Sequence, residues 1–347
     1  MSLITYLTRI HFADRVLEDA LAEEIARRRI RRPLLLCDTD TARGEALERV
    51  ADALPVDARP RRLVLDGASA QADLRCARDA LGAAQSDGIL GVGGMRPLDL
   101  ARALGAAALP VIAIPTGPET VGLGPLGAGT AQAAPRPPAL PAAILCDATL
   151  TLETGAEALA AGGMDALVHC LESYLSIAYN PPADGIALDG LRRAARNIEA
   201  AVTGTGPGRL APRRELLAAA LDAGLAAQKG VGGVEAAAHG LETVAATRHG
   251  ALHAALLHAV LAFNAPAIGD RLSDLERALD LPAGADIAAA LTRLAARIGL
   301  PRRLSEAGIA RSALSAAARR AAADPANRTN PRHATSADYE RILEAAF

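Results

Sequence analysis

Gly163-Met164-Asp165-Ala166-Leu167-Val168-His169 sets a carboxylate and an imidazole four residues apart. Positions i and i+4 of an α-helix share a face, so Asp165 and His169 are expected to point at one ion or one substrate. A second segment, His249-Gly250-Ala251-Leu252-His253, repeats this spacing with two imidazoles and leads into an apolar stretch. The second segment is expected to supply the other side of the same site.

The chain after about residue 155 has no strand signals and consists of helical segments separated by Gly and Pro. The predicted helices are Ala156–Ile177, Ala183–Val202, Arg213–Gln228, Val234–Thr247, Ala251–Phe263, Leu272–Leu279, Ile287–Gly299, Ala310–Ala322 and Ser336–Ala346. We therefore expect an all-helical domain over residues 155–347.

Residues 1–154 alternate short apolar runs with helical segments rich in Arg, Ala and Leu. Helices are predicted near Thr41–Ala53, Gln71–Ala84 and Pro97–Leu104. The predicted strands are Pro33–Cys37, Arg62–Leu65, Gly88–Val92, Val111–Pro115 and Ala143–Asp147. Strands that alternate with helices favour a mostly parallel sheet, so this part is predicted to be an α/β domain of the nucleotide-binding type.

The composition excludes several classes of function. The chain has 347 residues, a formal net charge of −2 and no basic block, which argues against a nucleic-acid-binding surface. Lys229 is the only lysine, so a Schiff-base mechanism has a single candidate. No signal peptide is visible, and polar residues and a proline interrupt the long uncharged stretch Ala251–Gly269, which favours a buried helix over a membrane span. A cytoplasmic protein without a membrane segment is expected.

The motifs in their linear order resemble those of the iron-containing alcohol dehydrogenase family. Gly163–His169, followed by Glu172 and by Asn180-Pro181, is similar to the family's G-M-D-A-L-x-H-x-x-E…N-P run. His249–Asn264 resembles the family's second histidine segment. Two further runs look most like maleylacetate reductases within this family: Phe263–Ala267 and Asn330–Arg332.

The resemblance implies a Rossmann-like parallel-sheet domain followed by a helical metal and substrate domain, the fold shared with dehydroquinate synthases. It also implies NAD(H) or NADP(H) in the cleft between the domains, a small-molecule substrate and a homodimer. Many such proteins hold Fe²⁺ or Zn²⁺ through one Asp and three His, whereas maleylacetate reductases typically do not depend on a metal.

The implied metal ligands are Asp165, His169, Glu235 and His249. The family pattern H-x3-H-x9-H, anchored on His249, puts His239 at its middle position and Glu235 at its first. Two carboxylates and two imidazoles suit Zn²⁺ or Fe²⁺. A one-residue slip would put Ala236 at the first position and leave three ligands. Maleylacetate reductases commonly have Asn where this chain has Asp165, so Asp165 favours a metal.

The implied phosphate loop departs from the family's G-G-G-S-x-x-D-x-x-K run. Here Gly93-Gly94-Met95-Arg96 is followed by Asp99, and Met95 stands where a glycine is usual. Glycines in such a loop let backbone N–H groups approach a pyrophosphate at a helix N-terminus. Arg96 is expected either to hold a phosphate itself or to fill the space.

Three other positions complete the implied nucleotide site. Thr116 and Thr120 lie in the run that resembles the loop beside the nicotinamide, where Glu119 and Thr120 are expected to substitute for missing residues if the loop takes another path. Asp38 follows a predicted strand and is expected either to meet the ribose hydroxyls or to cap the next helix.

These inferences predict an NAD(P)H-dependent reductase of a small carbonyl or enol-type acid, either metal-assisted or metal-independent, with maleylacetate-like dicarboxylates as the nearest substrates. His239 or His253 would manage the proton, and a hydrogen-bonded core histidine is the alternative role for His239. Two other hypotheses stay open: redox-neutral, metal-assisted chemistry (a lyase, cyclase or isomerase) and a catalytically silent homologue.

Overall fold

The computed structural model describes residues 4, 8–66, 69–105, 109–134, 136–242 and 247–347. The chain divides into two compact units, which we describe separately. The first is built on Thr5–Thr154 and contains the sheet, and the second is built on Gly155–Phe347 and is helical.

The N-terminal unit is built on six parallel strands in the order β1-β6-β5-β4-β2-β3. The five predicted strands are confirmed within one residue at each end, because β2, β4, β5 and β6 are apolar runs that are buried nearly throughout. The first strand was not predicted, since its sequence Arg-Ile-His-Phe has the polar, half-exposed character of an edge. The strands are β1 (Arg9–Phe12), β2 (Pro33–Asp38), β3 (Arg61–Leu65), β4 (Gly88–Gly93), β5 (Val111–Pro115) and β6 (Ala143–Cys146).

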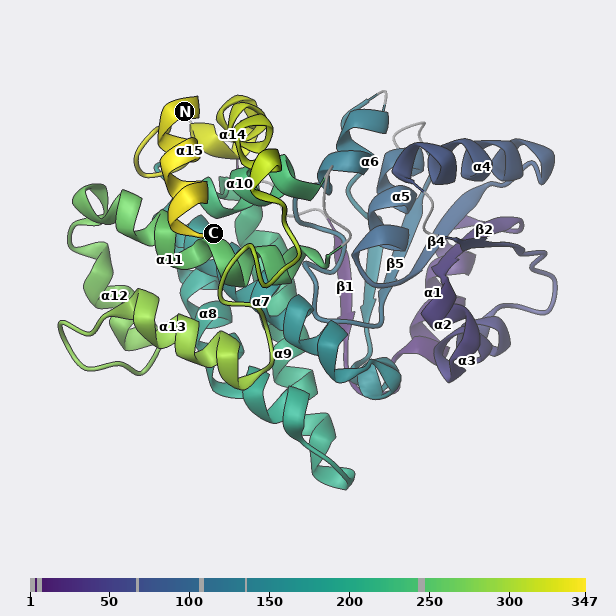
Figure 1. Ribbon diagram of the computed structural model, residues 1–347. Helices are drawn as coiled ribbons and strands as arrows, with labels where there is room; N and C mark the ends of the chain where they lie inside the picture. The colour runs from purple at the N-terminus through teal and green to yellow at the C-terminus, as the bar shows by residue number, and fades with distance from the viewer. Residues whose placement is uncertain (1–3, 5–7, 67–68, 106–108, 135, 243–246) are drawn as a thin grey trace. The chain divides into compact units, whose positions relative to one another are not determined.

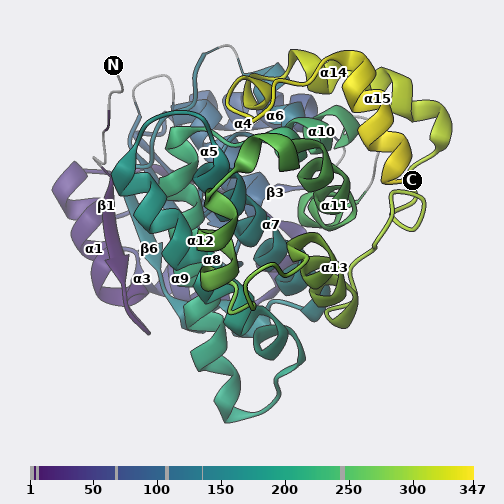
Figure 2. The same cartoon turned by 90° about the vertical axis from the view of Figure 1, so that its left-hand side faces the viewer.

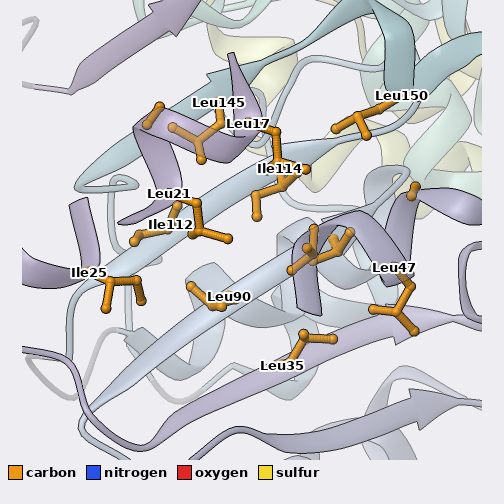
Figure 3. Packing of buried hydrophobic residues seen from close by; sticks show 14 of the residues in the cluster. Leu17, Leu21, Ile25, Leu35, Leu47, Leu90, Ile112, Ile114, Leu145 and Leu150 are labelled. Carbon is orange, nitrogen blue, oxygen red and sulfur yellow. The ribbon is translucent and has the colours of Figure 1, made fainter. Parts of the chain in front are cut away.

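Helices cover both faces of this sheet (Figure 1). On one face, apolar side chains of two helices pack against the strands, as Figure 3 shows for Leu17, Leu21 and Ile25 and for Leu47. The predicted helix Thr41–Ala53 is two helices, because Gly44 between them is extended. The helices are α1 (Leu17–Arg28), α2 (Thr39–Arg43), α3 (Glu45–Ala53), α4 (Ala70–Ala83), α5 (Met95–Gly105) and α6 (Ala128–Ala133), with a 3-10 turn at Ala148–Glu153.

The C-terminal unit is helical as predicted, and α7, α8 and α9 pack together in it (Figure 2). Asn180 caps α8 by accepting a hydrogen bond from the Ala183 backbone N–H at 3.3 Å. The helices are α7 (Ala156–Leu175), α8 (Pro181–Thr203), α9 (Leu210–Ala226), α10 (Gly233–Glu242), α11 (His249–Ile268), α12 (Arg271–Ala278), α13 (Ile287–Arg297), α14 (Leu314–Ala323) and α15 (Ser336–Ala345), with 3-10 turns at Pro207–Arg209, Ala227–Lys229, Arg311–Ala313 and Pro325–Arg328.

Most predicted helix boundaries of this unit lie within three residues of those observed. The helix predicted from Ala310 begins at Leu314, after a 3-10 turn at Arg311–Ala313. Helix α11 continues through Pro266 to Ile268, beyond the predicted end at Phe263. The predicted end of the preceding helix, at Thr247, follows residues 243–246, which lie outside the described residues. By length and composition α11 is also the one helix of the described chain that could cross a membrane. Of its most apolar 18-residue stretch, 67% is buried inside the protein, so core packing explains its apolar sequence.

Three carboxylates share one guanidinium where α8 meets α9. The Nε atom of Arg193 lies 2.6 Å from Asp189 and 3.7 Å from Asp222, and Nη1 binds Glu215. Burial, together with the charge of Asp189 and Glu215, raises the pKa of Asp222 to about 7, although Arg193 opposes the shift.

We expect Asp222→Asn to stabilise the protein by about 2 kcal/mol near pH 8 and to change little near pH 4. The raised pKa means that the folded protein keeps a proton that the unfolded chain loses between about pH 4 and pH 7. The stability contributed by protonated Asp222 is therefore full at low pH and is lost as the pH rises through about 7. Urea unfolding at both pH values measures the difference, and a pH-independent difference would contradict the prediction.

Candidate functional site

Three helices of the C-terminal unit each carry a pair of polar residues at i and i+4. All of these side chains are buried, although buried ionisable groups are rare unless they are paired or bind a metal. The structure therefore brings together all six predicted site residues of this unit. They are Asp165 and His169 on α7, Glu235 and His239 on α10, and His249 and His253 on α11.

Glu235 lies at the centre of this cluster. Its Oε2 atom is 3.0 Å from the Nε2 atoms of both His249 and His253 and 3.4 Å from Nε2 of His169. Its Oε1 atom is 3.0 Å from Nε2 of His239. Glu235, rather than Ala236, is thus the residue of α10 that faces the imidazoles.

Asp165 is the second carboxylate in contact with these imidazoles. Its Oδ1 atom is 3.3 Å from Nδ1 of His169, 3.5 Å from Nδ1 of His253 and 3.6 Å from Nε2 of His249. Several atoms of the cluster have no hydrogen-bond partner within the described part of the chain, and such atoms are costly when buried. They are both carboxylate oxygens of Asp165, Nε2 of His169, Nε2 of His239 and Nδ1 of His253.

These unpartnered atoms fit a metal ion. Two sets of three side chains each offer ligand atoms that lie within 4.8 Å of one another: Asp165, His169 and His253 in one, and Glu235, His249 and His253 in the other. Carboxylate oxygens and imidazole nitrogens are the donors that Zn²⁺ and Fe²⁺ accept in proteins.

A second layer of acceptors orients the imidazoles. Nδ1 of His249 is 2.5 Å from Glu242, Nδ1 of His239 is 2.9 Å from Asp324, and Nδ1 of His169 is 2.9 Å from the Asp165 carbonyl. In metal sites such outer partners fix the tautomer and direct the second ring nitrogen at the ion. The sequence motifs did not identify Glu242 or Asp324. Glu242 stands three residues after His239 on α10, a helical spacing that could have indicated it, whereas Asp324 lies far along the chain.

Glu172 fixes the start of α10. Its carboxylate accepts hydrogen bonds from the backbone N–H groups of Gly232, Val234 and Glu235 at 2.7–3.1 Å. Glu172 follows His169 by three residues on α7, so the same helical face that carries the site also holds the helix that supplies Glu235.

The charges in the cluster perturb one another strongly. Burial opposes ionisation of Glu235, but the neighbouring imidazoles outweigh it and hold the pKa of that carboxyl well below its usual value. Burial and the positive charge of His249 lower the pKa of His253 to about 4. Burial also opposes protonation of His239, yet Glu235 and Asp324 raise its pKa to about 10. Strongly shifted titrating groups of this kind gather at functional sites.

The predicted nucleotide-site residues of the N-terminal unit lie at or after the carboxyl ends of β2, β4 and β5. Ligands of parallel α/β sheets bind at this edge. Gly93 has a φ of +136°, a backbone conformation open to glycine, and its carbonyl accepts a hydrogen bond from the Thr116 N–H at 3.1 Å. Asp38 caps α2 by accepting a hydrogen bond from the Thr41 N–H at 2.8 Å, which is one of its two expected roles.

Two charged residues of the predicted phosphate loop are bound within the protein. The Nε atom of Arg96 donates to Asp73 on α4 at 2.7 Å. Asp99 is buried and accepts a hydrogen bond from the Gly127 N–H at 2.9 Å. Of the two roles expected for Arg96, filling space within the protein is the one that its contact with Asp73 favours.

The carboxylate of Glu119 lies over two glycines of these loops. A Cβ atom added to Gly94 would be 3.1 Å from Glu119 Oε1, and one added to Gly117 would be 2.5 Å from Oε2. Thr120 is buried beside Gly124, where an added Cβ would be 2.4 Å from the threonine hydroxyl. The space that the glycines leave open is thus taken by the side chains of Glu119 and Thr120.

Comparison with known proteins identifies the family. The model "Iron-containing alcohol dehydrogenase" matches residues 8–123, and "Fe-containing alcohol dehydrogenase family, C-terminal" matches residues 159–347. A 4-hydroxybutyrate dehydrogenase from Cupriavidus necator is 36% identical, with full coverage of both chains.

Solved structures agree with this assignment. A 1,3-propanediol oxidoreductase has a TM-score of 0.86 at 25% identity, covering 100% of both chains. A maleylacetate reductase from Agrobacterium tumefaciens has a TM-score of 0.79 at 25% identity, covering 100% of this chain and 99% of its own. Proteins of this family are oxidoreductases that use NAD(P)H and iron or a similar metal. The chain therefore belongs to the iron-containing alcohol dehydrogenase family and is an NAD(P)-dependent oxidoreductase.

Proposed function

We propose that this protein is a metal-dependent oxidoreductase that interconverts a short hydroxy acid and the corresponding carbonyl acid. The observation that carries the proposal is the buried cluster of two carboxylates and several imidazoles, whose unpartnered atoms match the needs of a divalent ion. The substrate class follows the similarity to a 4-hydroxybutyrate dehydrogenase at 36% identity. Maleylacetate is the second candidate, supported by structural neighbours at 25–26% identity.

Asp165, His169, Glu235 and His249 would hold the metal ion. A bound Fe²⁺ or Zn²⁺ would polarise the oxygen of the substrate, and NAD(P)H would supply the hydride. Asp165 and Glu235 together provide two negative charges, which balance a divalent cation in a site that excludes water.

We assign the proton to His239. Its Nδ1 atom is fixed by Asp324, so Nε2, beside Glu235, is the atom that exchanges a proton. Its side chain keeps 9% of its surface exposed, whereas His253 has none, and a proton donor must reach the reacting oxygen.

Arg248 is our candidate for binding the carboxylate of the substrate. It directly precedes His249, is half-exposed and lines a cavity of about 420 Å³ together with Ala161, Glu157 and Glu306. Its Nε atom lies 3.3 Å from Glu157 Oε1, so a substrate carboxylate would replace Glu157 as its partner. Ala161 lies one helical turn before Asp165 on α7, so residues that are neighbours of the metal cluster in the sequence line this cavity. A guanidinium suits a carboxylate because it can donate two parallel hydrogen bonds.

The functional test is oxidation of 4-hydroxybutyrate with NAD⁺ and with NADP⁺, and reduction of maleylacetate with the two reduced cofactors, followed by nicotinamide absorbance. Protein loaded with Fe²⁺ or Zn²⁺ is compared with protein treated with a chelator. Turnover of a short hydroxy acid that depends on metal supports the proposal. If neither cofactor reacts with either substrate, redox-neutral chemistry at the same cluster becomes the better hypothesis.

We also propose that the protein is a homodimer. Light scattering in solution, which measures the molar mass, tests this proposal.

Glu119 should weaken nucleotide binding, because its carboxylate lies on the glycines proposed to receive the phosphates. We expect Glu119→Gln to tighten NADPH or NADH binding roughly 5-fold, the effect of removing about 1 kcal/mol of charge repulsion. A fluorescence titration of the nicotinamide measures the dissociation constant. Glu48→Gln, an equal change of charge on the exposed face of α3, is the matched control. Equal affinity of both variants and wild type would show that phosphates do not approach Glu119.

A further inference from the structure

His253 occupies a special place in the cluster on α11. It lies one helical turn after His249 and has no exposed surface. Its ring centroid is 4.1 Å from that of His249 and 5.4 Å from that of His169. It is thus packed between the imidazoles that come from two different helices.

The two ring nitrogens of His253 face the two carboxylates of the cluster. Nε2 lies 3.0 Å from Glu235 Oε2, and Nδ1 lies 3.5 Å from Asp165 Oδ1 without a hydrogen-bond partner in the described residues. A histidine that only fills a protein core normally has both nitrogens hydrogen-bonded, because a buried unpaired nitrogen costs about 1–3 kcal/mol. The unpartnered Nδ1 therefore points to a ligand.

His253 is also shared by both metal-compatible sets of the described chain. Each of the other members, Asp165 and His169 or Glu235 and His249, belongs to one set. Whichever of the two sets an ion occupies, His253 is therefore one of the three side chains that offer it a ligand atom.

We propose that His253 is a further protein ligand of the metal ion, so that three imidazoles and two carboxylates surround it. This inference rests on the metal centre of the proposed function. With His253 the site offers five protein donors, one more than a tetrahedral zinc site uses. We therefore expect the bound ion to be at least five-coordinate.

The alternative is that His253 only donates a hydrogen bond to Glu235 and never touches the ion. X-ray absorption at the metal edge separates the two cases, since it counts the imidazoles bound to the metal. Purified full-length protein loaded with Zn²⁺ should show three imidazoles, from His169, His249 and His253. Two imidazoles would overturn the inference, and this measurement needs no variant.

The variant His253→Asn provides a second readout. It should lose one imidazole from the spectrum and bind Zn²⁺ more than about 100-fold more weakly in competition with a chelator, beyond the roughly 10- to 100-fold that loss of an outer hydrogen-bond partner costs. His258→Asn is the matched control, because His258 is on the same helix but its Nε2 atom faces the Ala345 carbonyl outside the cluster. Unchanged affinity and an unchanged imidazole count in His253→Asn would overturn the inference. Failure of the wild-type protein to bind any metal would overturn the proposed metal centre as well, whereas bound metal with two imidazoles overturns this inference alone.

Discussion

Gly250→Ala is expected to destabilise the protein by about 3 kcal/mol and to disrupt the metal cluster. A Cβ atom at position 250 would lie 1.8 Å from the backbone carbonyl oxygen of Ala161, far closer than two non-bonded heavy atoms can approach. The obstacle is backbone, not the end of a flexible side chain, so α11 as a whole must move away from α7. Because α7 carries Asp165 and His169, that movement would separate them from His249 and His253.

Urea unfolding measures the loss of stability, and competition with a chelator measures the loss of metal affinity. Gly185→Ala is the matched control, since position 185 lies inside helix α8 and an added Cβ would meet nothing within 4 Å. That substitution should stabilise the protein by about 0.5–1 kcal/mol, because alanine favours a helix over glycine. If Gly250→Ala unfolds at the same urea concentration as wild type, the close approach of α11 to α7 is not required.

Much of the fold could be predicted because the relevant signals are local. The strands β2, β4, β5 and β6 are buried apolar runs, a pattern that the sequence shows directly. Edge strand β1 was missed because Arg9 and His11 give it no such run; its place depends on pairing with β6, far along the chain. The break at Gly44 was also missed, although glycine in a predicted helix is a weak signal for an interruption.

The candidate site could be predicted in part for the same reason. The spacing of four residues identified Asp165 with His169 on α7 and His249 with His253 on α11. Glu235 and His239 on α10 came from the family pattern anchored on His249. The sequence could not show that Glu235 lies at the centre of the cluster, since this depends on how α10 is rotated against its neighbours. Contacts between distant residues were likewise invisible: Arg96 binds Asp73 and His239 binds Asp324 only after folding.

Asp165→Asn should abolish most of the stabilisation that metal gives to the folded protein. A metal that binds only the folded state stabilises it by RT ln(1 + [L]/Kd), which is about 4.1 kcal/mol at a free concentration of 1,000 times Kd. Loss of one carboxylate ligand should weaken the metal affinity roughly 100-fold. This is the upper end of the loss in metal affinity that follows removal of a residue hydrogen-bonded to a ligand. At the same metal concentration the stabilisation then falls to about 1.4 kcal/mol.

The choice of Asp165 follows from its surroundings. Both of its carboxylate oxygens lack hydrogen-bond partners in the described chain, and its side chain is 2% exposed. Its negative charge can therefore be balanced only by a bound ion or by the neighbouring imidazoles. Thermal unfolding with and without Zn²⁺ measures the effect for wild type, Asp165→Asn and Asp222→Asn. The last variant makes the same chemical change on α9, away from the cluster, and should keep the full gain from metal. An equal gain in all three proteins would mean that Asp165 holds no metal and that its charge serves the imidazoles alone.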